Sequence, residues 1–129
     1  MTGTSRKLRL PGWRRLRHQA DFDRVYAARC RVSDGQLLVY ADIGREVRGT
    51  RIGLSVSRKQ GNAVRRGRLK RLLREAFRQQ QHEIPDGLDL VLIPRQGAEV
   101  TLESLSRSLL KLTSKLSARL TSRDGVEAE

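Results

Sequence analysis

Residues 61–79 read GNAVRRGRLKRLLREAFRQ, and the rest of the chain can be arranged around this stretch. Apolar residues recur in it at spacings that place them on one stripe of an α-helix facing a core. Asn62 stands where its side chain can accept a hydrogen bond from the first turn, as an N-cap does. The stretch therefore predicts an amphipathic helix, whose apolar stripe consists of Leu69, Leu72, Leu73, Ala76 and Phe77.

The opposite side of this predicted helix is almost wholly basic. Residues 58–78 hold nine Arg or Lys and one acid, Glu75. Like charges four residues apart and cations in the first turn both destabilise a helix, and Gly67 costs about 1 kcal/mol relative to alanine. A solvated face normally mixes both signs of charge, so this one is predicted to contact a nucleic acid. The candidate binding residues are Arg58, Lys59, Asn62, Arg65, Arg66, Arg68, Lys70, Arg71, Arg74 and Arg78.

The net charge of +13 on 129 residues is concentrated in two segments. Residues 1–18 hold six Arg or Lys and no acid, residues 58–78 carry a net +8, and the remaining residues sum to −1. Basic patches on a nearly neutral scaffold are typical of nucleic-acid binding. The length fits a single domain with a modest core.

Cysteine content and hydropathy narrow the location of the protein. Cys30 is the only cysteine, which excludes an intrachain disulfide and a zinc site built on cysteines, and the expected location is the reducing cytoplasm. No run approaches the ~20 apolar residues of a membrane span, and the start of the chain lacks the apolar region of a signal peptide. Because the apolar stripe of the basic helix is needed for a core, no membrane partner is expected.

Apolar periodicity predicts the remaining elements. A short helix spans about 19–28, strands span 36–43, 51–57 and 88–93, and leucines at spacings of three and four give a third helix over about 102–120. An extra strand near residues 30–33 is optional. The order α-β-β-(β)-α-β-α predicts an α/β (α+β) two-layer sandwich, a small central sheet of about four strands with three helices. The β-α-β connection through the basic helix would be right-handed by default.

The two ends are predicted to lie outside the folded domain, which spans residues 19–120. Residues 1–18 are interpreted as a flexible basic arm that orders on a polyanion, with Arg14, Arg15 and Arg17 as its candidate contacts, or as a frayed terminus. Trp13 could stack on a base or anchor the arm on the domain surface. Residues 121–129 are expected to be a disordered tail.

Three segments resemble the bacterial ribonuclease P protein subunit. SVSRKQGNAVRRGRLKRLLREAF at 55–77 is similar to the basic-helix motif of that family, and RLRHQADFDRVYAAR at 15–29 is similar to its first helix. The resemblance continues through LLVY, RIGLSVSRK and LDLVLIPR, and so covers about residues 15–95. The family motif centres on Arg-Asn-Arg, but Gly67 stands in the middle position here, so no role of that asparagine carries over.

The resemblance implies a fold, partners and a division of labour. The implied fold has a left-handed β-α-β crossover around the basic helix, against the default hand. The implied partners are the catalytic RNA subunit of ribonuclease P, bound by the basic helix, and precursor tRNA, whose 5′ leader lies in a cleft between the first helix and the sheet. The RNA would catalyse hydrolysis with Mg²⁺, while the protein, a monomer on the RNA, would bind no cofactor or metal and hold no catalytic residue.

The implied cleft has candidate aromatic and small polar residues. Unpaired bases stack on aromatic rings with little sequence preference. Small polar residues on an outer strand face leave room for a ligand backbone, or simply face solvent. The aromatic candidates could instead all belong to the core. The cleft candidates are Phe22, Tyr26, Tyr40, Ser55 and Ser57.

Two other functions compete with that of an RNA-binding subunit. A self-sufficient nuclease needs two positioned acid–base groups or clustered metal-binding carboxylates. The sequence contains only His18 and His82, far apart along the chain, and its acids are scattered. A ribosomal or other general basic RNA- or DNA-binding protein is compatible with composition alone.

Overall fold

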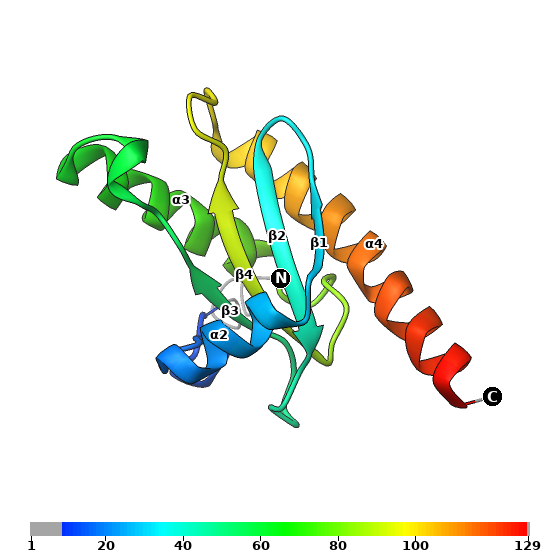
Figure 1. Ribbon diagram of the computed structural model, residues 1–129. Helices are drawn as coiled ribbons and strands as arrows, with labels where there is room; N and C mark the ends of the chain where they lie inside the picture. The colour runs from blue at the N-terminus through cyan, green and yellow to red at the C-terminus, as the bar shows by residue number, and fades with distance from the viewer. Residues whose placement is uncertain (1–8, 129) are drawn as a thin grey trace, which may run out of the picture.

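The computed structural model describes the backbone of residues 9–128 and the side chains of residues 9–122. Its elements run through the chain in an order that agrees with the predicted one, with the optional strand present (Figure 1). They are η1 (Gly12–Arg14), α2 (Gln19–Ala27), β1 (Cys30–Ser33), β2 (Leu37–Ile43), β3 (Arg51–Leu54), η2 (Arg58–Gln60), α3 (Ala63–Gln80), β4 (Leu88–Pro94) and α4 (Leu102–Ala128). The predicted α+β fold is confirmed.

The four strands form one mixed sheet in the order β1-β2-β4-β3. β2 pairs antiparallel with both β1 and β4, whereas β3 lies parallel to β4. The register places Arg31 of β1 opposite Tyr40 of β2, and Arg51 of β3 opposite Asp89 of β4. β4 is therefore central and buried along nearly its whole length, as its apolar sequence predicted.

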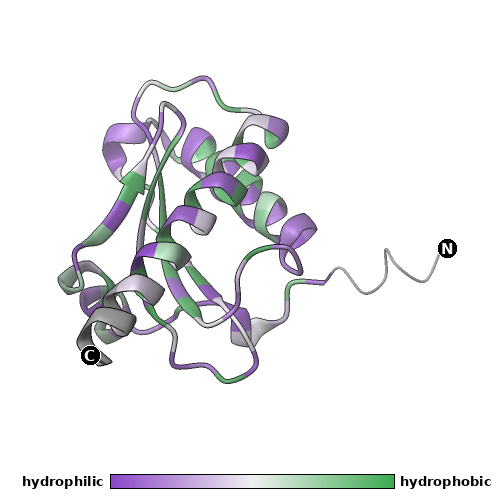
Figure 2. Cartoon of the chain, turned by 90° about the vertical axis from the view of Figure 1, so that its right-hand side faces the viewer, coloured by the Kyte–Doolittle hydropathy of each residue, from purple (hydrophilic) through white to green (hydrophobic). Residues whose placement is uncertain are grey.

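The sheet has two unequal faces. Alternate strand residues such as Val39, Leu90 and Leu92 pack with the apolar stripes of α3 and α4 into the main core. Val91, on the other side of β4, joins a smaller cluster with Leu16 and Val25 beneath α2. The hydropathy colouring agrees, because most of the green lies on the strands and on the sides of the helices that face them (Figure 2). The short α2 thus adds a partial third layer to the two that were expected.

The connection from β3 through α3 to β4 is left-handed. In Figure 1 both strands run upward, β4 lies to the right of β3, and α3 passes behind the sheet. Most β-α-β connections are right-handed, so the default expectation is wrong here. The left hand implied by the family resemblance is confirmed. The left hand places α3 on the same face as α4, where their apolar stripes share one core. A right-handed connection would have placed α3 over the face that α2 occupies.

The N-terminal segment is not a flexible arm where the structure describes it. From residue 9 onward it packs on the domain, and the remainder of the predicted arm, residues 1–8, lies outside the described residues. Arg15 forms a parallel bridge with Ile52, and the backbone N–H of Leu16 donates to the carbonyl of Ile52 at 2.8 Å. These bonds extend the sheet beyond the edge of β3, which local sequence does not reveal.

The C-terminal boundary also differs from the expected one. α4 continues beyond residue 120 as far as Ala128, whereas a disordered tail was expected from residue 121. No proline interrupts residues 102–128, so the helical backbone can run on past the last core leucine, Leu120.

The basic helix α3 has the predicted cap and the predicted buried stripe. Asn62 Oδ1 accepts a hydrogen bond from the backbone N–H of Arg65 at 2.9 Å. Leu69, Leu73 and Phe77 are almost fully buried, while Leu72 is half-buried at the edge of the stripe. Packing of this stripe, and not intrinsic propensity, therefore holds together a helix with many like charges.

Replacing Gly67 by alanine should stabilise the protein by up to about 1 kcal/mol, since the residue lies inside a regular helix. A Cβ there would lie 3.5 Å from Arg71 Nη1, which is ordinary contact. Gly53→Ala is the matched contrast, because its Cβ would lie 2.5 Å from Cζ of Phe22 and should destabilise. Thermal unfolding of both variants measures the effects. A less stable Gly67→Ala would contradict the regular-helix interpretation.

Candidate nucleic-acid interface

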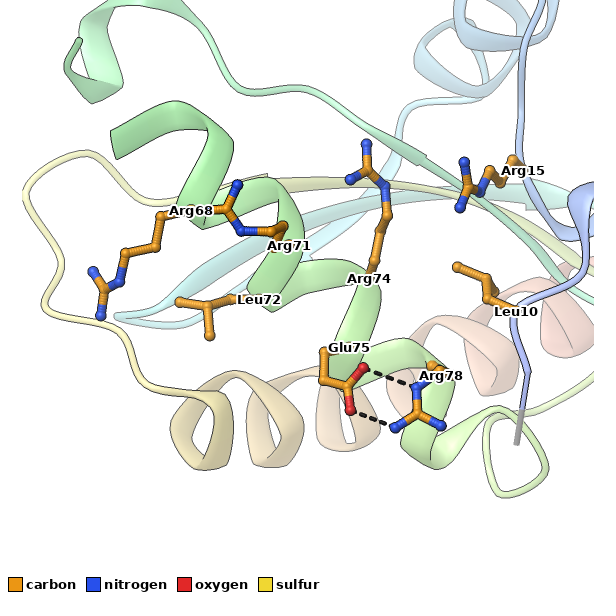
Figure 3. Close-up of a pocket in the computed structure, with 8 residues that line it drawn as sticks. All are labelled: Leu10, Arg15, Arg68, Arg71, Leu72, Arg74, Glu75 and Arg78. Atoms are coloured by element: carbon orange, nitrogen blue, oxygen red, sulfur yellow. Dashed lines mark hydrogen bonds and ion pairs between the residues drawn. The ribbon is translucent and has the colours of Figure 1, made fainter. Parts of the chain in front are cut away.

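The exposed side of α3 borders an open groove of about 510 Å³ (Figure 3). The cations Arg68, Arg71, Arg74 and Arg78 line it from the helix, and Arg15 lines it from the N-terminal segment. Leu10 and Leu72 supply apolar contacts, and Glu75 is the single acid. Arg15 therefore belongs to the same cationic surface as the helix, although it is distant in sequence.

Three of the predicted cations of this region also make bonds within the protein. The Nε–H groups of Arg65 and Arg66 donate to the backbone carbonyls of Gln60 and Gly61, at 2.8 and 3.1 Å. These bonds hold the turn between η2 and α3, so both side chains also support the fold. Arg78 forms an ion pair with Glu75, which raises the pKa of Arg78 and lowers that of Glu75.

The remaining predicted cations of the region are available at the surface. Arg58 and Lys59 are exposed on η2, Arg68 and Arg71 are exposed on α3, and Lys70 and Arg74 are half-buried beside them. Arg17 of the N-terminal segment is exposed as well.

The prediction that Arg14 contacts nucleic acid is wrong, because the side chain is buried. Only 6% of the residue is exposed, and its Nη1–H donates to the carbonyl of Thr50 at 2.9 Å. Burial lowers the pKa of its guanidinium group. Its guanidinium carbon lies 4.4 Å from the ring centroid of Trp13, and that of Arg48 lies 4.9 Å from the same ring. Trp13 therefore anchors the N-terminal segment on the domain.

Phe22 is separated from the two tyrosines with which it was grouped. Its ring lies directly against Gly53 of β3, in the space that a side chain there would fill. With Arg15, Lys70 and Arg74 it lines a smaller hollow of about 180 Å³ between α2 and α3. The room predicted above the outer face of β3 is thus partly taken by Phe22. Ser55 and Ser57 follow the end of β3, half-buried and exposed respectively, and line none of these hollows.

Tyr26 and Tyr40 form a second aromatic site. Their ring centroids are 4.9 Å apart at an interplanar angle of 81°, an edge-to-face arrangement. Arg31 Nη1–H donates to the hydroxyl of Tyr40 at 3.0 Å. The two tyrosines, Arg29 and Arg31 line a hollow of about 510 Å³. Each ring keeps an accessible part next to a cation, which is the combination that binds unpaired bases and their phosphates.

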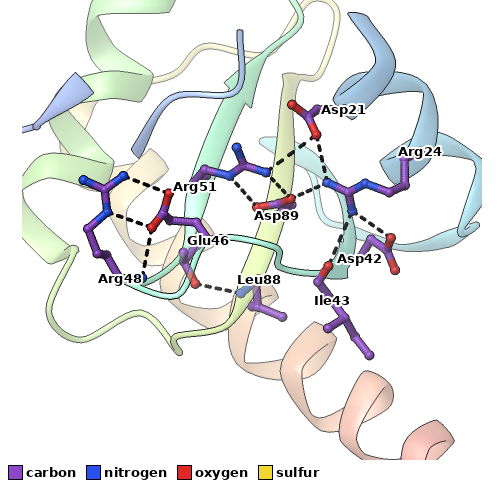
Figure 4. A network of polar contacts seen from close by, with 10 residues as sticks. Asp21, Arg24, Asp42, Ile43, Glu46, Arg48, Arg51, Leu88 and Asp89 are labelled. Atoms are coloured by element: carbon purple, nitrogen blue, oxygen red, sulfur yellow. Dashed lines mark hydrogen bonds and ion pairs between the residues drawn. The ribbon is translucent and has the colours of Figure 1, made fainter. Parts of the chain in front are cut away.

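A buried carboxylate network positions α2 on the sheet (Figure 4). Asp89 of β4 is fully buried, accepts two hydrogen bonds from Arg51 at 2.7 and 3.0 Å, and is also paired with Arg24 of α2. Arg24 bridges to Asp42 at 2.9 Å and to Asp21 at 3.2 Å. Burial alone would lower the pKa of Arg24, but its hydrogen bonds to the three carboxylates raise it. This network therefore sets where Phe22 and Tyr26 stand relative to the strands.

Comparisons with known proteins agree with this arrangement. The family model described as Ribonuclease P matches residues 10–117. The chain belongs to the ribonuclease P protein family.

Individual members of the ribonuclease P protein family are similar in sequence and in structure. The ribonuclease P protein component of Brevibacillus brevis is 42% identical over 97 residues, which cover 74% of this chain and 77% of that one. The RNase P protein of Staphylococcus aureus has a TM-score of 0.69 at 35% identity, covering 78% of this chain and 93% of that one. The RNase P protein from Thermotoga maritima has a TM-score of 0.68 at 32% identity, covering 75% of this chain and 92% of that one.

Membership of the ribonuclease P protein family establishes the general role. The protein is a component of ribonuclease P, the endoribonuclease that processes the 5′ end of tRNA, and it works together with RNA. A general ribosomal or DNA-binding role is thereby set aside. In the described part of the chain, no three His, Cys, Asp or Glu side chains are grouped to hold a metal ion, and no helix is long and apolar enough to cross a membrane. His18 and His82 are both exposed.

Several residues of these sites are not evident from the sequence. Asp89 lies within an otherwise apolar strand, and only the register with Arg51 shows its role. Arg29 precedes the optional strand and Arg31 lies within it, and only the pairing of β1 with β2 brings Arg31 to Tyr40. The YAARCRV stretch did carry a signal, namely two cations within five residues of a tyrosine at the start of a strand.

Asp89→Asn should lower the free energy of unfolding by about 3–5 kcal/mol, because it leaves Arg24 and Arg51 partly buried without their shared anion. Asp23→Asn is the control, since Asp23 is exposed and bonds only to Gln19 among the described residues. Denaturant unfolding of both variants gives the comparison. Equal, small losses of unfolding free energy in the two variants would show that the buried ion pairs of Asp89 do not hold α2 in place.

Proposed function

We propose that the protein binds the catalytic RNA subunit of ribonuclease P through α3 and grips the 5′ leader of precursor tRNA between α2 and the sheet. The observation that supports this most is the groove along α3, where five arginines converge with a single acid. Arginine pairs with phosphate in a bidentate manner, and local positive charge drives RNA binding by releasing counterions.

The leader site of the proposal rests on a different surface. Tyr26 and Tyr40 carry aromatic rings beside Arg29 and Arg31 on the face of the sheet opposite α3. Aromatic rings bind unpaired bases without strong sequence preference, at about 1–3 kcal/mol per base. Such a site suits a leader whose sequence differs from one precursor to another.

In this proposal the RNA subunit performs catalysis with Mg²⁺, and the protein holds no cofactor of its own. Its contribution is to position RNA and to raise the affinity for substrate, as a monomer bound to the RNA. Cys30 is a free, buried thiol, which suits the reducing cytoplasm, where we place the protein.

Replacing Arg68 and Arg71 together by glutamine should weaken binding to the RNA subunit and flatten its salt dependence. Each phosphate contact contributes about 0.7–0.9 to the slope of log K against log salt, so two lost contacts should lower it by about 1.5. Filter binding over a range of salt concentrations measures the slope. The control is Arg45→Gln with Arg107→Gln, an equal charge change at two exposed sites outside the α3 groove. An unchanged slope in a folded double mutant would place the RNA surface elsewhere.

Tyr26→Leu and Tyr40→Leu should each weaken binding of long-leader precursors by about 1–3 kcal/mol, because leucine fills the space but offers no ring for stacking. Contact that is equal in substrate and transition state raises KM and leaves kcat nearly constant. Multiple-turnover cleavage by the reconstituted holoenzyme measures both constants.

Precursors with the leader trimmed to a short stub are the control for the tyrosine variants, and they should be cleaved almost normally. Equal losses on long and short leaders would mean that the rings serve the fold or face the RNA subunit. Cleavage by the protein without any RNA would overturn the assignment of catalysis to the RNA.

A further inference from the structure

α4 carries a second cationic stripe, which the motif of the basic helix does not include. Arg107, Lys111, Lys115 and Arg119 follow one another at intervals of four residues and lie on one side of the helix. Like charges at this spacing destabilise a helix, so the stripe is unfavourable for the helix itself. α3 carries like charges at the same spacing, from Arg66 through Lys70 and Arg74 to Arg78.

The stripe divides into a neutralised half and an unpaired half. Arg107 pairs with Glu103 at 3.7 Å, and Lys111 pairs with Asp34 at 3.1 Å. Hydrogen bonds, that from Lys111 among them, outweigh burial and lower the pKa of Asp34 to about 2, so it stays ionised. Lys115 and Arg119 have no acidic partner among residues 9–122.

The unpaired half faces a groove with cations from two other elements. Lys115 and Arg119 line a hollow of about 440 Å³ together with Arg31 of β1 and Arg95, which follows β4. Its other lining residues are uncharged. Arg119 Nη1–H donates to the carbonyl of Arg31 at 3.1 Å, which brings the C-terminal half of α4 against the edge strand. Four cations from three separate segments thus converge on one hollow without a carboxylate in its lining.

This groove adjoins the tyrosine site and lies apart from the basic helix. Arg31 lines both the groove and the hollow of Tyr26 and Tyr40, and it is hydrogen-bonded to Tyr40. β1 is the edge of the sheet opposite β3, the strand that leads into α3. A strand of RNA stacked on the tyrosines can therefore pass over Arg31 and onto α4 without approaching α3.

We propose that the β1–α4 groove, formed by Arg31, Arg95, Lys115 and Arg119, binds the phosphodiester backbone of single-stranded RNA that continues beyond the tyrosine site. If the tyrosine site holds the leader, as proposed above, this RNA is the distal part of the 5′ leader. Aromatic platforms followed by a cationic track are the usual means of holding single strands without sequence preference. The ligand class is a backbone of phosphates, since the groove offers charge but no ring of its own.

The test is the double variant Arg95→Gln with Lys115→Gln in the reconstituted holoenzyme. Within the described residues neither side chain makes a hydrogen bond or an ion pair, so the fold should be unaffected. Affinity is measured for precursors that differ only in leader length. For the longest leader we expect roughly tenfold weaker binding at 0.15 M salt. The slope of log K against log salt should be lower by about 1.4, because two phosphate contacts at ~0.7 each are lost. Precursors with a stub leader should bind normally.

The control is again Arg45→Gln with Arg107→Gln, where Arg107 lies on the same helix but outside the groove. Equal losses for all leader lengths, or weaker binding of the RNA subunit itself, would overturn the leader assignment and place another RNA on the groove. No loss for any leader would overturn RNA binding there altogether.

The tyrosine variants separate failure of this inference from failure of the proposed function. If they lose affinity only for long leaders while Arg95→Gln with Lys115→Gln loses none, the leader site stands and the groove is refuted. If the loss of affinity depends on leader length neither in the tyrosine variants nor in Arg95→Gln with Lys115→Gln, both assignments are wrong.

Discussion

The buried carboxylate of Asp89 is the interaction on which the arrangement of the two faces depends. It lies on the central strand without exposure to solvent and binds Arg51 of the neighbouring strand and Arg24 of α2. A buried charge is tolerated only with close partners, and losing one of them is far more costly than losing a surface pair. The network therefore admits one position for α2, and with it one position for Phe22, Tyr26 and the hollows that they line.

The left-handed connection is the second constraint, and it keeps two candidate RNA-binding surfaces apart. Because α3 shares a core with α4, the opposite face of the sheet is covered only by α2. The cationic groove of α3 thus lies at the β3 edge, while the tyrosines and Arg31 lie toward the β1 edge. A small domain of this kind can present separate surfaces to two RNA segments.

The cations divide by what their side chains contact. Arg14, Arg24 and Arg51 are held by backbone carbonyls or carboxylates and stabilise the fold. Arg68, Arg71 and Lys115 extend into open grooves. Composition cannot distinguish the two groups, since a buried arginine and an RNA-binding arginine are the same residue type. What distinguishes them is the distance to an acceptor within the protein.

Local patterns in the sequence determined the elements and the main basic surface, because periodicity, capping and one-sided charge are properties of neighbouring residues. Asn62, the stripe of Leu69 and Phe77, and the strand phasing around Ile52 were all accessible in this way. Only the tertiary structure decided the burial of Arg14, the packing of Phe22 on Gly53, the pairing of Asp89, and the meeting of Arg31 with α4. Each of these depends on strand register or on the hand of a crossover, which bring together residues tens of positions apart, and no local pattern encodes that proximity.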